Sequence, residues 1–324
     1  MNFTRKMCRF LSCALILLCA GCTEKSENSQ GTDMLAAQRP DIVATNAFYY
    51  DRDVEAAHAF YQDTLGFEAV VDYGFAKIYR LAESSYLTVV QADEGMHSAD
   101  EPKIVTLQLV TDELNRWRDY LARRDIPIEY DGQDSDNASS FTIRDVDGYA
   151  LRFVRYNPHP GHAGYVAGFA APTPVKSRVS DDGPMSIRAT AFSVYYPDLG
   201  DVGDVGTARA FFEALFEVRE GGALNGVPVY PISSSGFVAL EAYEGPPLTS
   251  PGENGMTLSF FTSDVDAWFE RASSWPGFKL RTEEVLNEGG LVRVFVGYDP
   301  AGIFLEWDTF LEVPENQLLN AHLE

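Results

Sequence analysis

The sequence predicts an α+β protein with a duplicated body, and three observations lead to this fold class. Of its 324 residues 45% are hydrophobic, which is enough to build cores for about two domains. Strand-like runs alternate with helix-like periods, and one order of elements recurs four times. Two motifs recur at nearly equal offsets, because Asp53 corresponds to Asp204 (204 − 53 = 151) and Asp145 to Asp299 (299 − 145 = 154).

The first 21 residues have the composition of a secretory signal peptide. Arg5, Lys6 and Arg9 precede an apolar run, 10–20, which is shorter than the ~20 residues that a membrane-spanning helix needs. We therefore predict a signal peptide over residues 1–21 and exclude it from the fold. An uncleaved anchor and a signal without lipidation are the alternatives.

Residues 18–22, with the sequence Leu-Cys-Ala-Gly-Cys, resemble a bacterial lipobox. The resemblance implies cleavage before Cys22, lipidation of Cys22 and attachment to the cell envelope through that lipid alone. Thr23 follows the cysteine, and by the same resemblance this favours the outer membrane. All four cysteines lie within the first 22 residues, so the mature chain would keep one and could form no internal disulfide.

Residues 22–40 are polar and show no apolar period, which is typical of a flexible tether with a span of ~25 Å. A first domain is predicted over 41–157. It begins with a strand at 46–50 and a helix that places Ala57, Phe60 and Tyr61 on one face. Further elements are expected in this order: strands at 67–73, 75–81, 86–91 and 104–110, a helix around 114–121, and two strands ending at 153.

A second domain is predicted over 185–313, after a linker at 158–184 that is rich in Pro, Gly and Ala. Its elements repeat the first order: strand 189–195, helix 208–216, strands to 242, strand 256–262, helix 265–272, and strands to 307. Residues 314–324 are left as a tail. The body is thus read as four strand–helix–strands modules, two in each half.

The charge of the chain excludes some classes of partner. Twenty-five basic and 48 acidic residues give a formal net charge of −23. Nucleic acids and acidic lipid surfaces both bind basic faces, so neither is expected as a partner of the folded body.

The repeated motifs resemble the vicinal oxygen chelate superfamily. They are the helix motif at 53–67 (DVEAAHAFYQDTLGF) and the closing turn and strand at 145–153 (DVDGYALRF). The superfamily includes glyoxalase I, extradiol dioxygenases and bleomycin-binding proteins. The resemblance implies two tandem domains, each of two βαβββ modules that form a half-closed barrel around a ligand. Whether modules pair within a half or across the linker is left open.

The resemblance also implies where ligands would bind, because family enzymes hold a divalent metal on four inward side chains. In the first half these positions carry Asn46, Gln91, Thr106 and Arg152. No strong metal donor is among them, and Arg152 would repel a cation. Arg152 suits a carboxylate or phosphate of a ligand, with Asn46 and Gln91 as hydrogen-bonding partners. Pairing of Arg152 with a neighbouring acid, or extension of its side chain to the rim, is the alternative.

In the second half the corresponding positions carry Thr190, Glu241, Thr257 and Glu306. Two carboxylates close together in a dry site would raise one pKa, so Glu241 and Glu306 are candidate catalytic acids or bases. A hard divalent cation in this second domain, or two carboxylates that face water, are the alternatives. Tyr50 and Gln108 complete the candidate ligand-binding set.

None of the five histidines falls on a predicted strand, and they lie at 58, 97, 159, 162 and 322. A ring-cleaving dioxygenase needs two histidines and a carboxylate in its cavity, so that activity is disfavoured. The leading hypothesis is a lipid-anchored protein that binds a small molecule without a metal or other cofactor. A lyase, isomerase or dioxygenase-related enzyme that uses Glu241 and Glu306 is the alternative, and an envelope scaffold is a third.

Overall fold

A computed structural model describes residues 39–324, with gaps at 132–135, 158–162, 180–182, 197–204, 225–226 and 244–253. The predicted signal peptide, Cys22 and most of the tether lie outside the described residues, as do His159 and His162. Residues 39–324 form one structural unit.

The first half of this unit contains two modules with the predicted order of elements. The first module consists of β1 (Ala44–Asp51), α1 (Val54–His58), the π-helix η1 (Ala59–Thr64), β2 (Glu68–Asp72), β3 (Ala76–Ala82) and β4 (Ser85–Gln91). The second consists of β5 (Val105–Val110), α2 (Leu114–Arg123), β6 (Tyr130–Asp131), β7 (Ala138–Arg144) and β8 (Ala150–Tyr156). The linker that follows contains α3 (Ala163–Ala170), β9 (Val175–Lys176) and β10 (Ser186–Ile187).

The second half repeats this arrangement. Its first module consists of β11 (Ala189–Tyr196), α4 (Val205–Leu215), β12 (Gly222–Leu224), β13 (Val227–Pro231) and β14 (Gly236–Ala242). Its second consists of β15 (Met256–Phe261), α5 (Val265–Ser273), β16 (Lys279–Leu280), β17 (Leu286–Glu288), β18 (Val292–Tyr298) and β19 (Phe304–Phe310). A short 3₁₀-helix, η3 (Pro314–Asn316), and α6 (Gln317–Leu323) end the chain. The predicted α+β class is confirmed.

Two large sheets combine the modules across the linker. In sheet A the strand order is β16-β18-β19-β15-β1-β4-β3-β2, and in sheet B it is β12-β13-β14-β11-β5-β8-β7-β6. Antiparallel pairing of β1 with β15 joins the first module to the fourth, and pairing of β11 with β5 joins the second to the third. The sequence left this pairing open. Each half-open curved sheet therefore takes one module from each half, and neither half completes a sheet alone.

Contacts near the junction of the two sheets show an approximate two-fold symmetry. The backbone N–H of Ser84 donates to Oγ of Ser235 at 2.7 Å, and the backbone N–H of Ser235 donates to Oγ of Ser84 at 2.8 Å. These residues are 151 positions apart, which is the offset of the helix motif. Reciprocal contacts of this kind are the mark of a two-fold axis.

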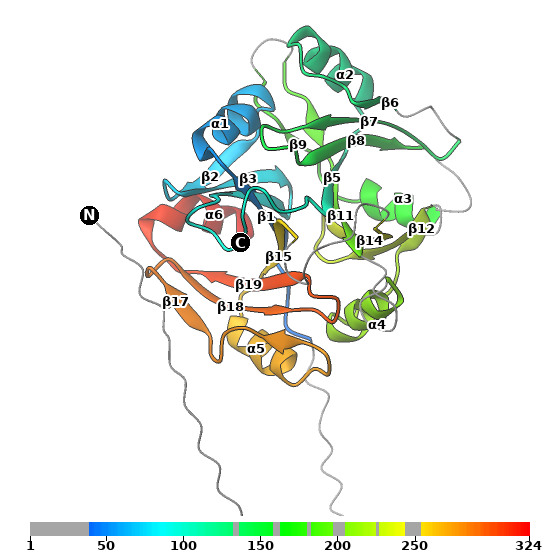
Figure 1. The fold of residues 1–324 in the computed structure, drawn as a ribbon. Helices are drawn as coiled ribbons and strands as arrows, with labels where there is room; N and C mark the ends of the chain where they lie inside the picture. Colours follow the sequence, from blue (N-terminus) through cyan, green and yellow to red (C-terminus); the bar gives the residue numbers. More distant parts are fainter. Residues whose placement is uncertain are drawn as a thin grey trace, which may run out of the picture. The chain divides into compact units, whose positions relative to one another are not determined.

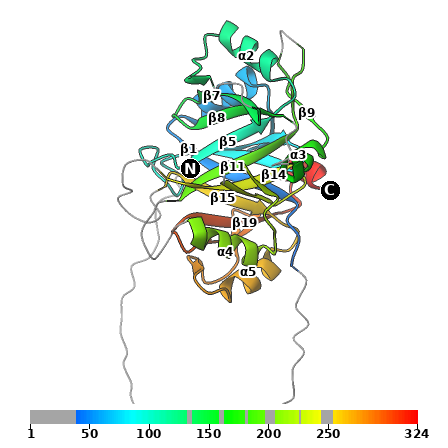
Figure 2. The ribbon, with the colours of Figure 1, turned by 90° about the vertical axis from the view of Figure 1, so that its right-hand side faces the viewer.

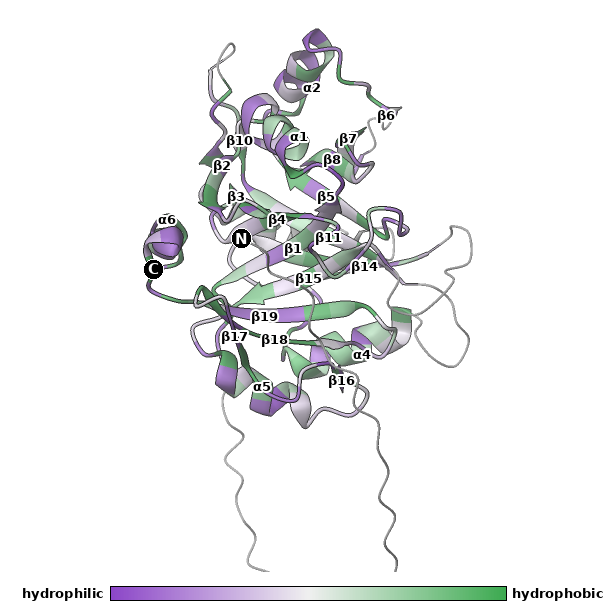
Figure 3. Ribbon diagram, turned by 60° about the vertical axis from the view of Figure 1, so that its left-hand side comes forward, coloured by the Kyte–Doolittle hydropathy of each residue, from purple (hydrophilic) through white to green (hydrophobic). Residues whose placement is uncertain are grey.

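Helices cover one face of each sheet (Figure 1). The pair α1 and α2 lies at one end of the unit, the pair α4 and α5 at the other, and the central strands cross between them (Figure 2). The apolar faces of the helices enter one large core, as Ala57, Phe60, Tyr61 and Leu65 do, which confirms the predicted helical period. Hydrophilic residues alternate with hydrophobic ones along α2 and α5, as expected for helices with one buried face (Figure 3).

Two helices that the sequence did not predict cover parts of the opposite faces. In α3, Phe169 stacks on Tyr156 and packs against Phe237 of sheet B, with ring centroids 5.1 and 4.4 Å away. In α6, Leu319 is fully buried against sheet A. The segments expected to be a plain linker and tail thus contribute to both sheets. Among the described residues, no helix combines the length and apolar character needed to cross a membrane.

Candidate functional site

The faces of the sheets away from the four large helices carry most of the predicted site residues. Successive side chains of a strand point to opposite faces, so the face of each residue follows from its neighbours. On β8, Leu151 and Phe153 enter the helix-facing core, and Arg152 therefore points to the other face. On β14, Val238 and Leu240 enter that core, and Glu241 lies on the other face.

We call these two faces floor A and floor B. Floor A, on sheet A, is defined by Asn46, Tyr50, Thr88, Thr257, Ser259, Glu306 and Asp308. Floor B, on sheet B, is defined by Thr106, Gln108, Thr142, Arg152, Ser193, Tyr195 and Glu241. Two predicted pairings are therefore wrong. Glu241 and Glu306 lie on different sheets, and Arg152 does not share a floor with Asn46, because modules combine across the linker.

Two further predicted residues lie outside the floors. Gln91 points to the helix side, where its Oε1 accepts from the N–H of Val54 at 3.2 Å and its Nε2 donates to the carbonyl of Arg52 at 2.7 Å. These two hydrogen bonds connect the Gln91 side chain to the backbone at the start of α1. Thr190 is fully buried and its hydroxyl hydrogen-bonds to Ser85 near the junction of the sheets.

Floor B has a hydrogen-bonded centre where the two halves meet. Thr106 Oγ1 and the Tyr195 hydroxyl are 3.0 Å apart, and Gln108 Nε2 donates to Ser193 Oγ at 2.6 Å. Gln108 Oε1 also accepts from the hydroxyl of Tyr156 at 2.8 Å. Burial raises the pKa of Tyr195, as does the charge of Glu241, so the phenol stays protonated. This centre is neutral, and its amide and hydroxyl groups hold β5 against β11.

Beside this centre lie two buried polar atoms without a partner. Arg152 is opposite Thr142 in the β7–β8 ladder. Neither Arg152 Nε nor Thr142 Oγ1 has a hydrogen-bond partner among the described residues, and both atoms are buried. Arg152 likewise forms no ion pair with any described residue. Thr142 was not singled out from the sequence, because threonine is common on strands. Its interest comes only from its position opposite Arg152, which no local sequence pattern shows.

The other end of floor B is apolar and adjoins a cavity. Val110, Val154 and Ala189 pack there beneath Phe169 of α3. A cavity of about 310 Å³ lies beside this end, and its lining includes Gly168, Val229 and Phe237.

Floor A contains a coupled pair of buried carboxyl groups. Burial raises the pKa of Glu306 well above its usual range, and the nearby carboxyls of Asp308 and Glu288 raise it further. Burial likewise raises the pKa of Asp308 to about 7, although Ser259 Oγ donates to its Oδ2 at 2.6 Å. Two neighbouring buried carboxyls cannot both ionise cheaply, so the pair of Glu306 and Asp308 favours keeping one proton.

The rest of floor A consists of neutral hydrogen-bonding groups. Asn46 Nδ2 donates to Thr88 Oγ1 at 3.0 Å, and the Tyr50 hydroxyl lies 2.7 Å from Thr257 Oγ1. The ring of His97 packs edge-on against Tyr50, with centroids 5.0 Å apart. Sequence reasoning placed His97 in a loop and set it aside, but this loop folds back over the end of β1.

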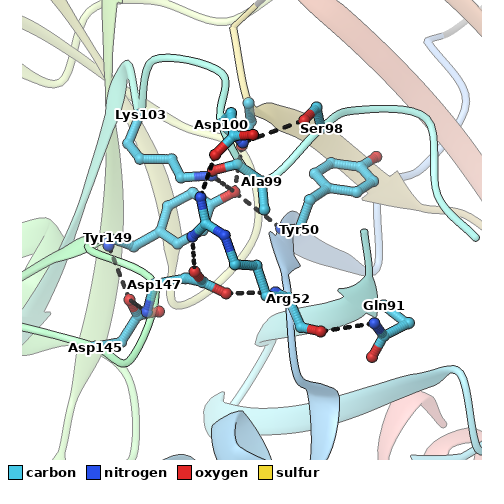
Figure 4. Close-up of polar contacts among 11 residues, drawn as sticks. Tyr50, Arg52, Gln91, Ser98, Ala99, Asp100, Lys103, Asp145, Asp147 and Tyr149 are labelled. Atoms are coloured by element: carbon cyan, nitrogen blue, oxygen red, sulfur yellow. Dashed lines mark hydrogen bonds and ion pairs between the residues drawn. The ribbon is translucent and has the colours of Figure 1, made fainter. Parts of the chain in front are cut away.

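A third polar cluster lies where the first module meets the second, on the helix side of β1 (Figure 4). Asp51 is fully buried, and neither of its carboxyl oxygens has a partner among the described residues. Burial raises its pKa to about 8, as do the charges of Asp145 and Asp147, while Lys103 acts in the opposite direction. Lys103 Nζ donates to the Tyr149 hydroxyl at 3.2 Å and to the carbonyl of Ala99 at 3.0 Å.

The donor groups of the floors do not fit a transition metal. Floor A offers an amide, hydroxyls and carboxyls of which one is protonated, and floor B offers one carboxylate together with a guanidinium. Zinc, iron and nickel favour imidazole, thiolate or clustered carboxylates. In the part of the chain that the structure describes, no three His, Cys, Asp or Glu residues are grouped so that they could hold a metal ion.

The fold and the floors define a class of protein in which paired βαβββ modules form curved sheets around polar inner faces. Residues 42–153 match the family described as the Glyoxalase/Bleomycin resistance protein/Dioxygenase superfamily. This match covers the first two modules and includes the motifs at 53–67 and 145–153, so it supports the resemblance predicted from them. No curated protein matches the sequence significantly.

Several solved structures share the fold over most of the chain. A provisionally assigned dioxygenase from Bacillus subtilis subsp. subtilis str. 168 has a TM-score of 0.60 at 11% identity, covering 84% of this chain and 86% of its own. A point mutant of glyoxalase I from Zea mays has a TM-score of 0.56 at 13% identity, covering 88% of this chain and 95% of its own. At these identities the likeness concerns the fold alone.

Proposed function

We propose that this protein binds a small anionic molecule on floor B, with Arg152 as the anchor, and does so without a transition metal. The observation that carries the proposal is the pair of buried donors without partners, Arg152 Nε and Thr142 Oγ1. A buried polar group without a hydrogen bond costs ~1–3 kcal/mol, so such groups are normally satisfied. A planar guanidinium beside a hydroxyl is suited to a carboxylate or phosphate.

The test of this proposal is the effect of simple anions on thermal stability. We expect carboxylates or phosphate esters to raise the melting temperature of the full chain in mild detergent, and Arg152→Gln to remove that increase. Arg155→Gln is the matched control, because Arg155 lies on the same strand with its side chain on the opposite face. The proposal fails if ligand-induced shifts are the same in wild type and R152Q.

Metal independence is a separate part of the proposal and rests on the donor chemistry of the floors. We expect purified protein to contain less than stoichiometric zinc, iron, nickel or manganese by elemental analysis, and anion binding to persist after chelator treatment. A stoichiometric metal that is lost in Glu306→Gln would contradict metal independence. It would not bear on the role of Arg152, which the thermal-stability experiment tests separately.

A second candidate function is acid–base catalysis on floor A, and the coupled pair of Glu306 and Asp308 favours it. Two coupled buried carboxyl groups that share one proton can donate and accept a proton in one turnover. Glu306→Gln should then abolish any turnover that wild type shows on isomerase or lyase substrates. Full turnover by that variant would exclude this function.

We further propose that the folded body is held at the envelope by lipid on Cys22. Support comes from the lipobox-like residues at 18–22. In a bacterial host, labelled fatty acid should enter wild type and Cys19→Ser but not Cys22→Ser. Equal labelling of all three would rule out this attachment.

A further inference from the structure

Floor B carries an unpaired cation and an unpaired carboxylate at two separate places. Arg152 lies on β8 and Glu241 on β14, and both are half-buried. No hydrogen bond or ion pair joins either side chain to any described residue, nor do the two pair with each other. From the sequence alone Arg152 was expected in a site of the first half and Glu241 in a site of the second half. The pairing of the second module with the third brings both residues onto one surface.

The strand order and register fix how far apart the backbones of the two residues lie. Strands β11 and β5 separate β14 from β8, which amounts to three strand spacings or ~14 Å. In the ladder Arg152 pairs with Gln108, which pairs with Ala191, which in turn pairs with Phe237 of β14. Glu241 lies four residues after Phe237 on β14, which corresponds to a further ~13 Å along the strand. The two residues therefore start from opposite ends of a diagonal of the floor, and their long side chains extend from these positions without forming an ion pair with each other.

The surface between these two charges is polar but already satisfied. Thr106, Gln108, Ser193 and Tyr195 bond to one another or to Tyr156, as described above. A ligand that spans the diagonal would therefore find its strongest unsatisfied partners at the two ends, with Thr142 assisting Arg152 at one of them.

We propose that the ligand of floor B is an elongated zwitterion, with an anionic group on Arg152 and Thr142 and an ammonium group on Glu241. This inference rests on the proposed function, in which Arg152 anchors an anion, and it adds the second charge and the length. A purely anionic ligand would leave the Glu241 carboxylate without a counter-charge, whereas an ammonium group on the same ligand would add a second favourable charge interaction at a half-buried site. An α-amino acid carries both charges at one end and could not reach both residues.

The experiment measures binding of matched probes to the full chain in mild detergent by calorimetry. The probes are hexanoate, hexylamine, aminohexanoate and aminooctanoate with the amine on the terminal carbon, and glycine as the short zwitterion. We expect an ω-amino acid to bind at least tenfold more tightly than hexanoate, hexylamine or glycine. Glu241→Gln should remove this advantage without weakening hexanoate, whereas Arg152→Gln should weaken hexanoate and the ω-amino acids alike.

Control variants separate a loss of binding from a loss of folding, and they distinguish failure of the zwitterion site from failure of the anion site. Glu270→Gln changes an exposed carboxylate on α5 and should bind as wild type does. Glu241→Asp and Arg152→Lys keep the charges if the neutral variants are too unstable to study. If hexanoate binds through Arg152 as tightly as the ω-amino acids do, the zwitterion inference is wrong and the anion site stands. If no probe depends on Arg152, the proposed function itself fails.

Discussion

At the scale of single residues, Asp51 is the most unusual group in the described part of the unit, because it is a buried acid whose oxygens have no partner there. The charged groups that act on its pKa are Asp145, Asp147, Lys103 and Arg52, and Tyr49, Tyr61 and Tyr149 also lie within its electrostatic reach. The opposing charges largely offset one another, so burial is the main cause of the shift and the pKa of Asp51 rises to about 8. A carboxyl group whose pKa is raised on folding favours the folded state at low pH. Its contribution is complete below the pKa of the unfolded chain, ~4, and is lost as pH rises through about 8.

Asp51→Asn should therefore flatten the dependence of stability on pH. At pH 8 we expect the variant to be more stable than wild type by at least ~1.4 kcal/mol, the equivalent of one pKa unit, with little difference near pH 4. Denaturant unfolding at several pH values measures this. Asp53→Asn is the control, since Asp53 caps α1 and asparagine caps equally well. Parallel pH profiles for wild type and D51N would show that Asp51 is ionised in the folded state.

The same scale shows why the candidate site could be predicted only in part. Asn46, Thr257, Arg152 and Glu306 were placed on inner faces because they lie on the first or last strand of their modules, and the turn at 299–302 fixed the count for Glu306. The same reasoning failed for Gln91, because a position counted across hairpins depends on every residue between. The β3–β4 ladder shifts register between Arg80 and Ala82, and a shift of one residue turns a side chain to the other face. Thr142 and His97 depend on partners distant in sequence, which no local pattern contains.

At the scale of elements, α6 shows how a short segment becomes part of the fold. Its apolar residues are too few to predict a helix, and they acquire a partner only when sheet A exists. Leu319 is fully buried against Val71, Ile78 and Phe261, whereas its neighbour Leu318 is 44% exposed.

Leu319→Ala should destabilise the protein by ~2–5 kcal/mol, because it removes a buried side chain and leaves a cavity. Leu318→Ala should change stability by less than ~0.5 kcal/mol, as exposed substitutions usually do. Urea unfolding of the two variants measures the difference. Equal effects would mean that α6 does not hold its place on sheet A in solution.

At the scale of the whole unit, the joining of modules across the linker has a direct test. The sequence identified four modules because each carries its own periodicity, but strand pairing between distant modules is not encoded in any one segment. The pairs β1–β15 and β5–β11 are the only sheet contacts between halves in the described ladders.

We expect a chain divided within 180–182 to reassemble from its two fragments. When both are produced together, they should co-purify as a stoichiometric pair with the circular dichroism of the intact protein. Each fragment alone should aggregate or self-associate, since it exposes unpaired strands. Two fragments that each purify as folded monomers would contradict the arrangement of the sheets.

The reciprocal contact of Ser84 and Ser235 has one more consequence. Two identical chains related by an exact axis must present the same side chains on both of their inner sheet faces. Here the two halves belong to one chain and differ in sequence, so the two floors carry different side chains. One now carries paired acids and the other a guanidinium facing a distant carboxylate. A single polypeptide with approximate two-fold symmetry can thus carry two candidate binding surfaces of different chemistry.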